Sequence, residues 1–314
     1  MLAAFFDASC ANESRELFGK MEIGKLRKEQ EKEWETGQNR SLCWPAQGKM
    51  RVEKRKYFFF DIDDTLLIHG DSTDGDYVPD STKEALRLLE ENGHFLAIAT
   101  GRSYCMAKKY MTDLGFKNMA HDGGNGVTID GEMLGIEPLD YEKSLAFLDE
   151  CEGKGFPWAF TPEDSMYRLT RDGAFQGKSR DRYMRTVVVP GLDPHDRAKY
   201  PKFHKLFVSC TAEEESQLKT LKDLPSIRYI PTYLFIEPMN KAKGIYRVLD
   251  HFGASPEDVV VFGDNYNDLS MFMPEWISIA MGNAVPELKE KAQYVTTQID
   301  EDGIFNACRH FGWI

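Results

Sequence analysis

Residues 57–65 read Tyr-Phe-Phe-Phe-Asp-Ile-Asp-Asp-Thr, a short apolar run followed at once by acids. A continuous apolar run of this length predicts a strand that is buried on both faces, as in a parallel sheet. Because side chains alternate along a strand, Asp61 and Asp63 fall on the same side where this strand ends. Chance alone produces this acid pattern in roughly a few per cent of chains, so it needs support from elsewhere in the sequence.

The residues that follow predict a strand–helix–strand unit. Ser81 and Glu84 have the spacing of a capping box ahead of an apolar helical face, and Gly93 marks the end of that helix. Residues 95–99, Phe-Leu-Ala-Ile-Ala, form a second apolar run. Two apolar strands joined through a helix in this way are expected to be parallel.

The same pattern returns late in the chain, where residues 244–252 predict a helix and residues 259–262 another buried strand. The sequence between these regions contains both helical and strand-like segments. We therefore predict an α/β fold, with a Rossmann-like, doubly wound parallel sheet as core and an inserted α+β domain. The core takes residues 51–137 and 232–314, and the inserted domain takes residues 138–231.

The first 50 residues differ from the rest. Residues 13–35 are dense in Glu, Lys and Arg with few apolar positions, which favours a solvated helix or a disordered arm. Met50 precedes a basic stretch and the first strong strand. We hypothesise that Met50 is the natural start and that residues 1–49 are an extension; the intact mass of protein from its native host tests this.

Composition limits the class of protein. The 314 residues are 42% hydrophobic, enough for a well-packed core, and the length favours two domains. A net charge of −12 argues against a general nucleic-acid binder. No apolar run approaches the roughly 18 residues of a membrane span, and no basic segment precedes the N-terminal apolar residues as in a signal peptide. We expect a cytoplasmic protein, a monomer or weak homodimer, without nucleic-acid or membrane partners.

The cysteines support the same location, because none of them forms a C-x-x-C pair. Scattered cysteines of this kind are typical of reduced thiols in the cytoplasm and not of a disulfide framework or a zinc site. They are Cys10, Cys43, Cys105, Cys151, Cys210 and Cys308.

Three further polar clusters follow predicted strands or begin helices. Thr100-Gly-Arg102 can bind phosphate through a hydroxyl and backbone N–H groups, although a helix N-cap with a solvent-exposed Arg is the alternative. Residues 240–244 contain Lys241 and Lys243, either of which could hold a phosphate oxygen at a helix start. Residues 263–268, Gly-Asp-Asn-Tyr-Asn-Asp, suit a hard cation such as Mg²⁺, or alternatively an acidic turn.

The order of these clusters carries more weight than any one of them. In an open parallel sheet, ligands bind beyond the carboxyl ends of the strands, so the four clusters are expected to converge. Two carboxylates there can divide the work, one attacking a phosphorus atom and one moving protons. A bound Mg²⁺ would offset the repulsion between an attacking carboxylate and a phosphate dianion.

These residues resemble the haloacid dehalogenase superfamily of phosphatases, and within it the Cof-type branch with a C2 (IIB) cap. The resemblance covers about residues 50–314 and implies that the inserted domain is the cap. Asp64 stands where many relatives have Gly. The matching stretches are residues 59–67, 99–102, 243–244, 263–268, 280–284, 292–297 and 301–303.

The resemblance implies the following catalytic roles. Asp61 would form an aspartyl-phosphate, while Asp63 would protonate the leaving oxygen and then activate water. Thr100 and the N–H of Gly101 would bind the phosphoryl oxygens. Lys243, preferred over Lys241 only through the resemblance, would stabilise the phosphoryl group and orient Asp61.

The resemblance also implies a Mg²⁺ cofactor. Asp61, Asp264 and the backbone carbonyl of Asp63 would hold the ion, and Asp268 would be a ligand or would support one. Asn267 would lie beside the transferred phosphate.

The expected function is Mg²⁺-dependent hydrolysis of small phosphorylated metabolites, such as sugar phosphates, through an aspartyl-phosphate. One alternative is a phosphomutase, which would isomerise hexose phosphates without releasing phosphate. Another alternative is a non-catalytic regulatory binding protein. The sign of such a protein would be the loss of an essential catalytic group. The sequence does not name the substrate.

Overall fold

The computed structural model describes residues 54–70, 75–178 and 184–314. Residues 51–314 form one compact unit. The predictions for residues 13–35, for Met50 as the start, and for Cys10 and Cys43 lie outside the described residues. The four described cysteines that remain are free thiols: Cys105, Cys151, Cys210 and Cys308.

The core is an eight-stranded sheet in the order β14-β13-β12-β1-β2-β3-β4-β5. The strands from β14 to β3 are parallel, whereas β4 and β5 extend the sheet in antiparallel pairs. The predicted α/β class is confirmed, with the difference that the sheet is mixed. The strands are β1 (Tyr57–Phe60), β2 (Phe95–Ala99), β3 (Asn118–His121), β4 (Gly126–Ile129), β5 (Glu132–Ile136), β12 (Val259–Gly263), β13 (Ile277–Ala280) and β14 (Tyr294–Val295).

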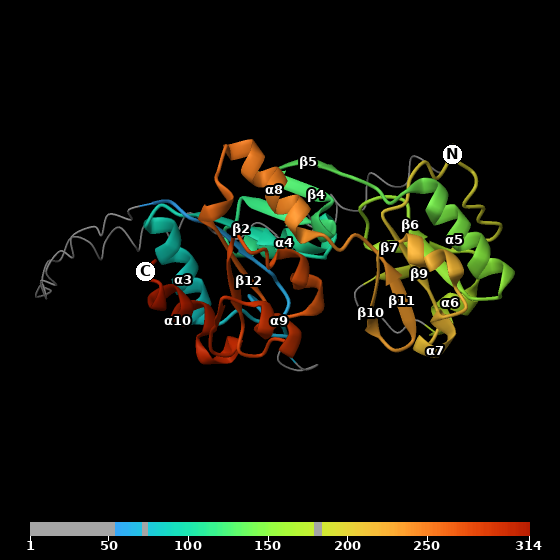
Figure 1. The fold of residues 1–314 in the computed structure, drawn as a ribbon. Coiled ribbons are helices and arrows are strands. Elements are labelled where there is room, and N and C mark those ends of the chain that lie inside the picture. The colour runs from blue at the N-terminus through green and yellow to red at the C-terminus, as the bar shows by residue number, and fades with distance from the viewer. Residues whose placement is uncertain (1–53, 71–74, 179–183) are drawn as a thin grey trace, which may run out of the picture. The chain divides into compact units, whose positions relative to one another are not determined.

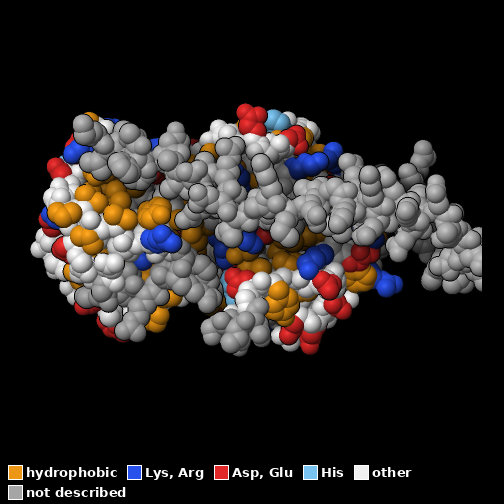
Figure 2. Space-filling view, turned by 180° about the vertical axis from the view of Figure 1, so that it is seen from behind, with side chains coloured by type: hydrophobic (Ala, Val, Ile, Leu, Met, Phe, Trp, Pro, Cys, Tyr) orange, Lys and Arg blue, Asp and Glu red, His pale blue; other side chains and the backbone are white. Residues whose placement is uncertain are grey.

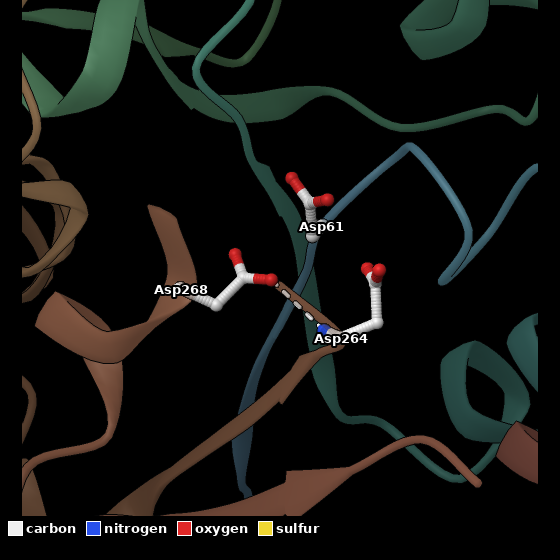
Figure 3. A group of neighbouring side chains, drawn as sticks. All are labelled: Asp61, Asp264 and Asp268. Atoms are coloured by element: carbon white, nitrogen blue, oxygen red, sulfur yellow. Dashed lines mark hydrogen bonds between the residues drawn. The ribbon is translucent and has the colours of Figure 1, made fainter. Parts of the chain in front are cut away.

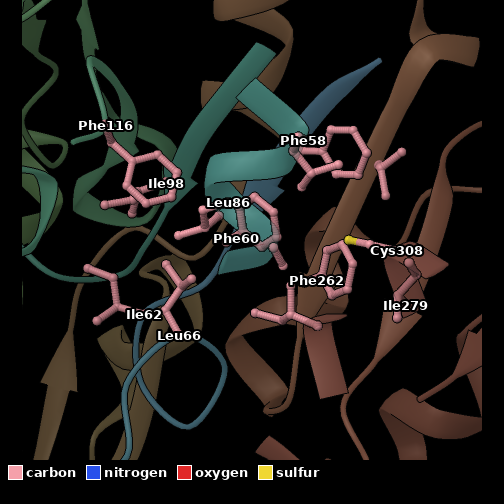
Figure 4. Close-up of a cluster of buried hydrophobic side chains, with 14 of the residues drawn as sticks. Phe58, Phe60, Ile62, Leu66, Leu86, Ile98, Phe116, Phe262, Ile279 and Cys308 are labelled. Carbon is pink, nitrogen blue, oxygen red and sulfur yellow. The ribbon is translucent and has the colours of Figure 1, made fainter. Parts of the chain in front are cut away.

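Helices cover both faces of this sheet, as Figure 1 shows. Phe58 and Phe60 pack on the face covered by α3, α4 and α10, and Figure 4 shows part of this cluster. Phe59 packs on the opposite face, against α8 and α9. The central strand is therefore apolar along its length because neither face meets water. The helices are α3 (Asp80–Glu91), α4 (Tyr104–Asp113), α8 (Lys241–Phe252), α9 (Pro286–Lys291) and α10 (Gly303–His310), with short 3₁₀ turns at Asp122–Gly124, Pro256–Asp258, Tyr266–Met271 and Ile299–Glu301.

Two helix starts differ from the prediction. Helix α3 begins at Asp80 after Pro79, which makes no side-chain cap, so the capping box predicted at Ser81 is wrong. Helix α8 begins at Lys241, three residues earlier than predicted, because the side chain of Asn240 accepts a hydrogen bond from the N–H of Lys243 and caps the helix. This earlier start places Lys241 in the first turn of α8.

A second, six-stranded sheet has the order β10-β11-β9-β6-β7-β8. One face packs against α5, and the other carries a smaller aromatic cluster that includes Phe207 and Tyr233. Because β11 belongs to this sheet, the chain returns to the core after Ile236, several residues beyond the predicted boundary at residue 231. The elements are α5 (Tyr141–Gly153), β6 (Trp158–Thr161), β7 (Tyr167–Thr170), α6 (Gly173–Lys178), β8 (Arg185–Val188), β9 (Lys205–Val208), α7 (Ala212–Glu215), a 3₁₀ turn (Lys219–Asp223), β10 (Ser226–Ile230) and β11 (Tyr233–Ile236).

Two features concern possible nucleic-acid and membrane partners, namely the distribution of charge on the surface and the apolar character of the helices. On the face shown in Figure 2, the basic side chains that can be seen lie among acidic and hydrophobic ones. Among the described helices, none combines the length and the apolar character that crossing a bilayer requires.

A close backbone contact fixes the start of α8. Gly124 has a φ of 96°, and a Cβ there would lie 1.9 Å from the carbonyl oxygen of Asn240. We expect Gly124→Ala to lower the free energy of unfolding by more than about 2 kcal/mol, because both the backbone conformation and the contact oppose a side chain. Gly131 has a φ of 82° and open space around it. Gly131→Ala should therefore cost only about 1–2 kcal/mol, and equal losses in chemical denaturation would contradict the steric argument.

Candidate active site

Three buried aspartates meet at the carboxyl ends of β1 and β12. The N–H of Asp61 donates to the carbonyl of Phe262 at 3.0 Å, which continues the β1–β12 pairing by one residue. Asp264 follows β12, and Asp268 lies in the 3₁₀ turn after it. One carboxylate oxygen from each aspartate lies within 4.8 Å of the other two, and Figure 3 shows the three side chains converging.

Burial and neighbouring charges raise the pKa of two of these acids, Asp61 and Asp264. Burial raises the pKa of Asp61 to about 7, against the lowering effect of Lys241 and with a further rise from Asp268. Burial and the charges of Asp268 and Asp61 raise the pKa of Asp264 to about 9. A cluster of buried carboxylates that resists ionisation fits a hard divalent cation, because the cation would neutralise the charges that now repel one another.

Hydrogen bonds hold two of these acids in place. The N–H groups of Asp264 and Asn265 each donate to Oδ2 of Asp268 at 2.9 Å. The hydroxyl of Thr65 donates to Oδ1 of Asp264 at 2.9 Å. Asp268 therefore braces the acidic turn as well as contributing charge to the cluster.

The lysine beside the cluster is Lys241. Its Nζ donates to Oδ1 of Asp61 and to Oδ1 of Asp268 at 2.5 Å each, and the residue is 1% exposed. Lys243 instead lies at the surface, where its Nζ bonds Glu137 at 2.6 Å and Asn125 at 3.0 Å. The prediction of Lys243 is wrong, because residues two apart on a helix point in nearly opposite directions and only one of them can face the site.

Asp63 makes different contacts from Asp61. Its carboxylate accepts hydrogen bonds from Nε and Nη2 of Arg102 at 2.9 and 2.5 Å, and lies 2.7 Å from Nε2 of His69. Burial alone would raise the pKa of Asp63, but His69 and Arg102 hold it well below its ordinary value. Its side chain is not part of the three-aspartate cluster. Asp64, the next residue, has a φ of 55°, a conformation that glycine adopts more readily than other residues.

The turn after β2 brings a backbone segment to the same place. The hydroxyl of Thr100 accepts a hydrogen bond from the N–H of Arg102 at 3.1 Å, and α4 begins later, with Ser103 at its N-cap. The N-cap alternative for Thr100 therefore does not apply. Gly101 lies beside Asn267, since a Cβ on the glycine would be 3.6 Å from Nδ2 of Asn267. Oδ1 of Asn267 is buried and has no hydrogen-bond partner.

Asp61, Asp63, Gly101, Arg102 and Asn267 line one cavity of about 530 Å³ that lies between the core and the second sheet. Its volume is typical of pockets for small molecules. Of the predicted site residues, Thr100, Lys243, Asp264 and Asp268 are not in its described lining. That lining comprises Asp61, Asp63, His69, Gly101, Arg102, Met106, Met184, Lys205, Tyr229, Ile230, Tyr233, Phe235, Glu237, Asn265 and Asn267.

The second sheet contributes a hydrogen-bonded network around Lys205 and Glu237, which the sequence alone did not indicate. Nζ of Lys205 donates to Oε2 of Glu237 at 2.5 Å and to the carbonyl of Gly101 at 3.0 Å. The hydroxyl of Tyr229 donates to Oε1 of Glu237 at 2.9 Å. This network ties β9, β10 and the end of β11 to the Thr100–Arg102 turn. Glu237 directly follows an apolar strand, which is the one sequence signal that could have indicated it.

Comparison with known proteins agrees with this arrangement. Residues 58–308 match the family model of haloacid dehalogenase-like hydrolases. YkrA of Bacillus subtilis, provisionally named a phosphatase, is 30% identical over 269 residues, which are 82% of this chain and 98% of YkrA. YcsE of Bacillus subtilis, a 5-amino-6-(5-phospho-D-ribitylamino)uracil phosphatase, is 24% identical over 82% of this chain and 95% of its own.

A solved structure supports the assignment. The subclass IIB sugar phosphatase BT4131 superposes with a TM-score of 0.65 and 30% identity, over 82% of this chain and all of that chain. The predicted family and the predicted enzyme class are confirmed. The chain belongs to the haloacid dehalogenase-like hydrolase family, in its Cof-type branch, and is a phosphatase.

Proposed function

We propose that the protein hydrolyses small phosphorylated metabolites with the help of Mg²⁺ and through an aspartyl-phosphate intermediate. The observation that carries this proposal is the position of Asp61, which is buried at the end of β1, hydrogen-bonded to Lys241, and open to the cavity. A carboxylate in this place can reach a phosphorus atom that enters from the cavity. It is also screened from bulk water, which would compete with it.

The reaction takes two steps. An oxygen of Asp61 bonds to phosphorus as the bond to the leaving oxygen breaks, and Asp63 gives that oxygen a proton. Asp63 then takes a proton from a water molecule that attacks the aspartyl-phosphate, which releases inorganic phosphate and restores Asp61. Asp63 therefore enters the first step protonated. The contacts with Arg102 and His69 stabilise the carboxylate that remains once its proton has been given up, which is the form that the second step requires.

Asp61, Asp264 and the backbone carbonyl of Asp63 would hold Mg²⁺, with Asp268 as a ligand or as support. When bound, the ion supplies positive charge that polarises the phosphoryl group. The geometry that favours it is the buried cluster in which Asp61 and Asp264 resist ionisation.

The phosphoryl oxygens would be bound by Thr100, the N–H of Gly101, Asn267 and Lys241, which takes the role first given to Lys243. The Nδ2 group of Asn267, which can donate to a phosphoryl oxygen, lies 3.6 Å from the position that a Cβ on Gly101 would take. Lys241 already contacts Asp61, so it can both orient the nucleophile and offset the charge of the incoming phosphate.

The substrate class rests on the cavity and on the relatives. A volume of about 530 Å³ suits a metabolite of modest size. BT4131 is a sugar phosphatase, and YcsE acts on a phosphorylated ribitylaminouracil. A small phosphomonoester is the class that fits both.

The test is phosphate release from p-nitrophenyl phosphate by purified protein, with Mg²⁺ and with a chelator. We expect turnover that needs Mg²⁺. Absence of turnover with Mg²⁺, or equal turnover with the chelator, contradicts the proposal. A product analysis with hexose phosphates separates hydrolysis from a mutase, since a mutase would isomerise the sugar without net release of phosphate.

A further inference from the structure

The cavity has an aromatic wall that belongs to the second sheet. Tyr229 and Ile230 come from β10, and Tyr233 and Phe235 come from β11. Side chains alternate along β11, and the two residues on its other face are buried in the main core of the second sheet. Phe235 is only partly buried, so its ring borders the cavity.

These rings form a packed group. The Phe235 ring centre lies 4.8 Å from that of Tyr233 and 5.1 Å from that of Tyr229, with the Tyr229 ring at 79° to it. Phe207 contacts Phe235 from β9 at 5.3 Å. The guanidinium of Arg168, which is 1% exposed, lies 5.0 Å from the ring centre of Phe207 and 5.2 Å from that of Tyr233. The wall is therefore held rigid by ring and cation–π contacts.

The polar groups beside this wall are already bonded to the protein. Lys205, Glu237 and the Tyr229 hydroxyl are hydrogen-bonded to one another, and the hydroxyl of Tyr233 lies 3.4 Å from Nη1 of Arg168. Sugar hydroxyls placed against this wall would lose water and would have to compete with these existing bonds for partners. A flat unsaturated ring would cover the same surface without that cost.

We propose that the preferred substrate is a phosphomonoester whose alcohol carries a planar aromatic or heteroaromatic ring, with Phe235 and Tyr229 as the residues that recognise the ring. This inference rests on the proposed function, because it concerns the leaving group of that same reaction. The phosphate lies toward Asp61, and the ring packs against β10 and β11. The specificity then comes from the second sheet while the chemistry comes from the core.

The test compares matched substrates: 2-phenylethyl phosphate, 2-cyclohexylethyl phosphate and glucose 6-phosphate. The first two have alkyl leaving oxygens of the same kind and nearly the same size, so their difference reports the planar ring. We expect kcat/KM for the phenylethyl ester to exceed the other two by at least about fivefold, the scale of aromatic stacking.

Variants test whether the preference for a planar ring comes from the aromatic wall. Phe235→Leu keeps an apolar side chain without a ring, and should raise KM for the phenylethyl ester about fivefold, with a smaller change in kcat. Phe235→Tyr retains the ring and should retain the preference. Tyr167→Leu, at an exposed tyrosine of β7 outside the cavity lining, is the matched control and should change neither constant.

The outcomes separate the two proposals. Equal kcat/KM for the phenylethyl and cyclohexylethyl esters, or a preference for glucose 6-phosphate, overturns this inference and leaves the phosphatase reaction standing. A Phe235→Leu variant that folds with an unchanged thermal transition and keeps the preference also overturns it. Failure to hydrolyse any of these esters, p-nitrophenyl phosphate included, contradicts the proposed function itself.

Discussion

Asp61→Asn is expected to lower kcat by at least about 10⁴-fold, because an amide cannot form the covalent intermediate and removal of a nucleophile has effects of this size or larger. The same change is expected to stabilise the metal-free protein at pH 8. The pKa of Asp61 is raised from 3.8 to about 7, so its ionised form costs folding free energy that a neutral amide does not. We expect a gain of roughly 1–3 kcal/mol in chemical denaturation with a chelator present.

The size of this stability gain depends on pH. The folded protein binds the proton of Asp61 more tightly than the unfolded chain, so the wild type loses stability as pH rises from about 4 to about 7. The advantage of Asp61→Asn should therefore be absent near pH 4 and complete above pH 7. Asp113→Asn, at an exposed acid of α4 paired with Lys109, is the control and should change neither activity nor stability appreciably. A variant that is inactive but less stable at pH 8 would contradict the electrostatic argument.

Lys241→Met is expected to lower the free energy of unfolding of the metal-free protein by about 3–5 kcal/mol, because it leaves buried carboxylates without their counter-charge. It should also reduce turnover by at least about 10³-fold, since no other group replaces its charge at Asp61. The measurements are chemical denaturation with a chelator present, and kcat with Mg²⁺.

Lys243→Met is the matched control, two residues along the same helix. Its partner Glu137 is half exposed, so the loss should stay below about 1 kcal/mol and activity should remain within about twofold of the wild type. The opposite pattern, with Lys243→Met inactive and Lys241→Met active, would restore the assignment made from the sequence.

The choice between these two lysines is a point that the sequence alone could not decide. The acids at 61, 264 and 268 were predicted to converge because each follows an apolar strand, and the carboxyl ends of parallel strands share one edge. Which of the two lysines faces the site depends on the rotation of helix α8 about its axis, and hence on the exact residue at which the helix begins. Asn240 carried that information as an N-cap, but helix boundaries are harder to place than helices.

The central strands β1, β2 and β12 were predicted because they are continuous apolar runs buried on both faces, whereas β3, β4, β5, β13 and β14 were missed. β5 is a partly exposed strand at the sheet edge, and its composition does not separate it from a loop. The position of Glu237 after an apolar strand could have indicated that residue, but its network with Lys205 could not be predicted. Its members come from different strands of the second sheet, and their partner Gly101 lies more than 100 residues away in the sequence. Such contacts follow from strand pairing, which leaves no local pattern.

The central position of β1 has a consequence for the order in which the chain is made. One edge of β1 pairs with β2 soon after synthesis, but the other edge pairs with β12, about 200 residues later. At typical elongation rates this edge waits roughly 10–40 s on the ribosome. The second sheet, which lies entirely between them in the sequence, is complete before β12 emerges. Until then one edge of this phenylalanine-rich strand has no native partner, which is the condition under which strand edges form wrong pairings.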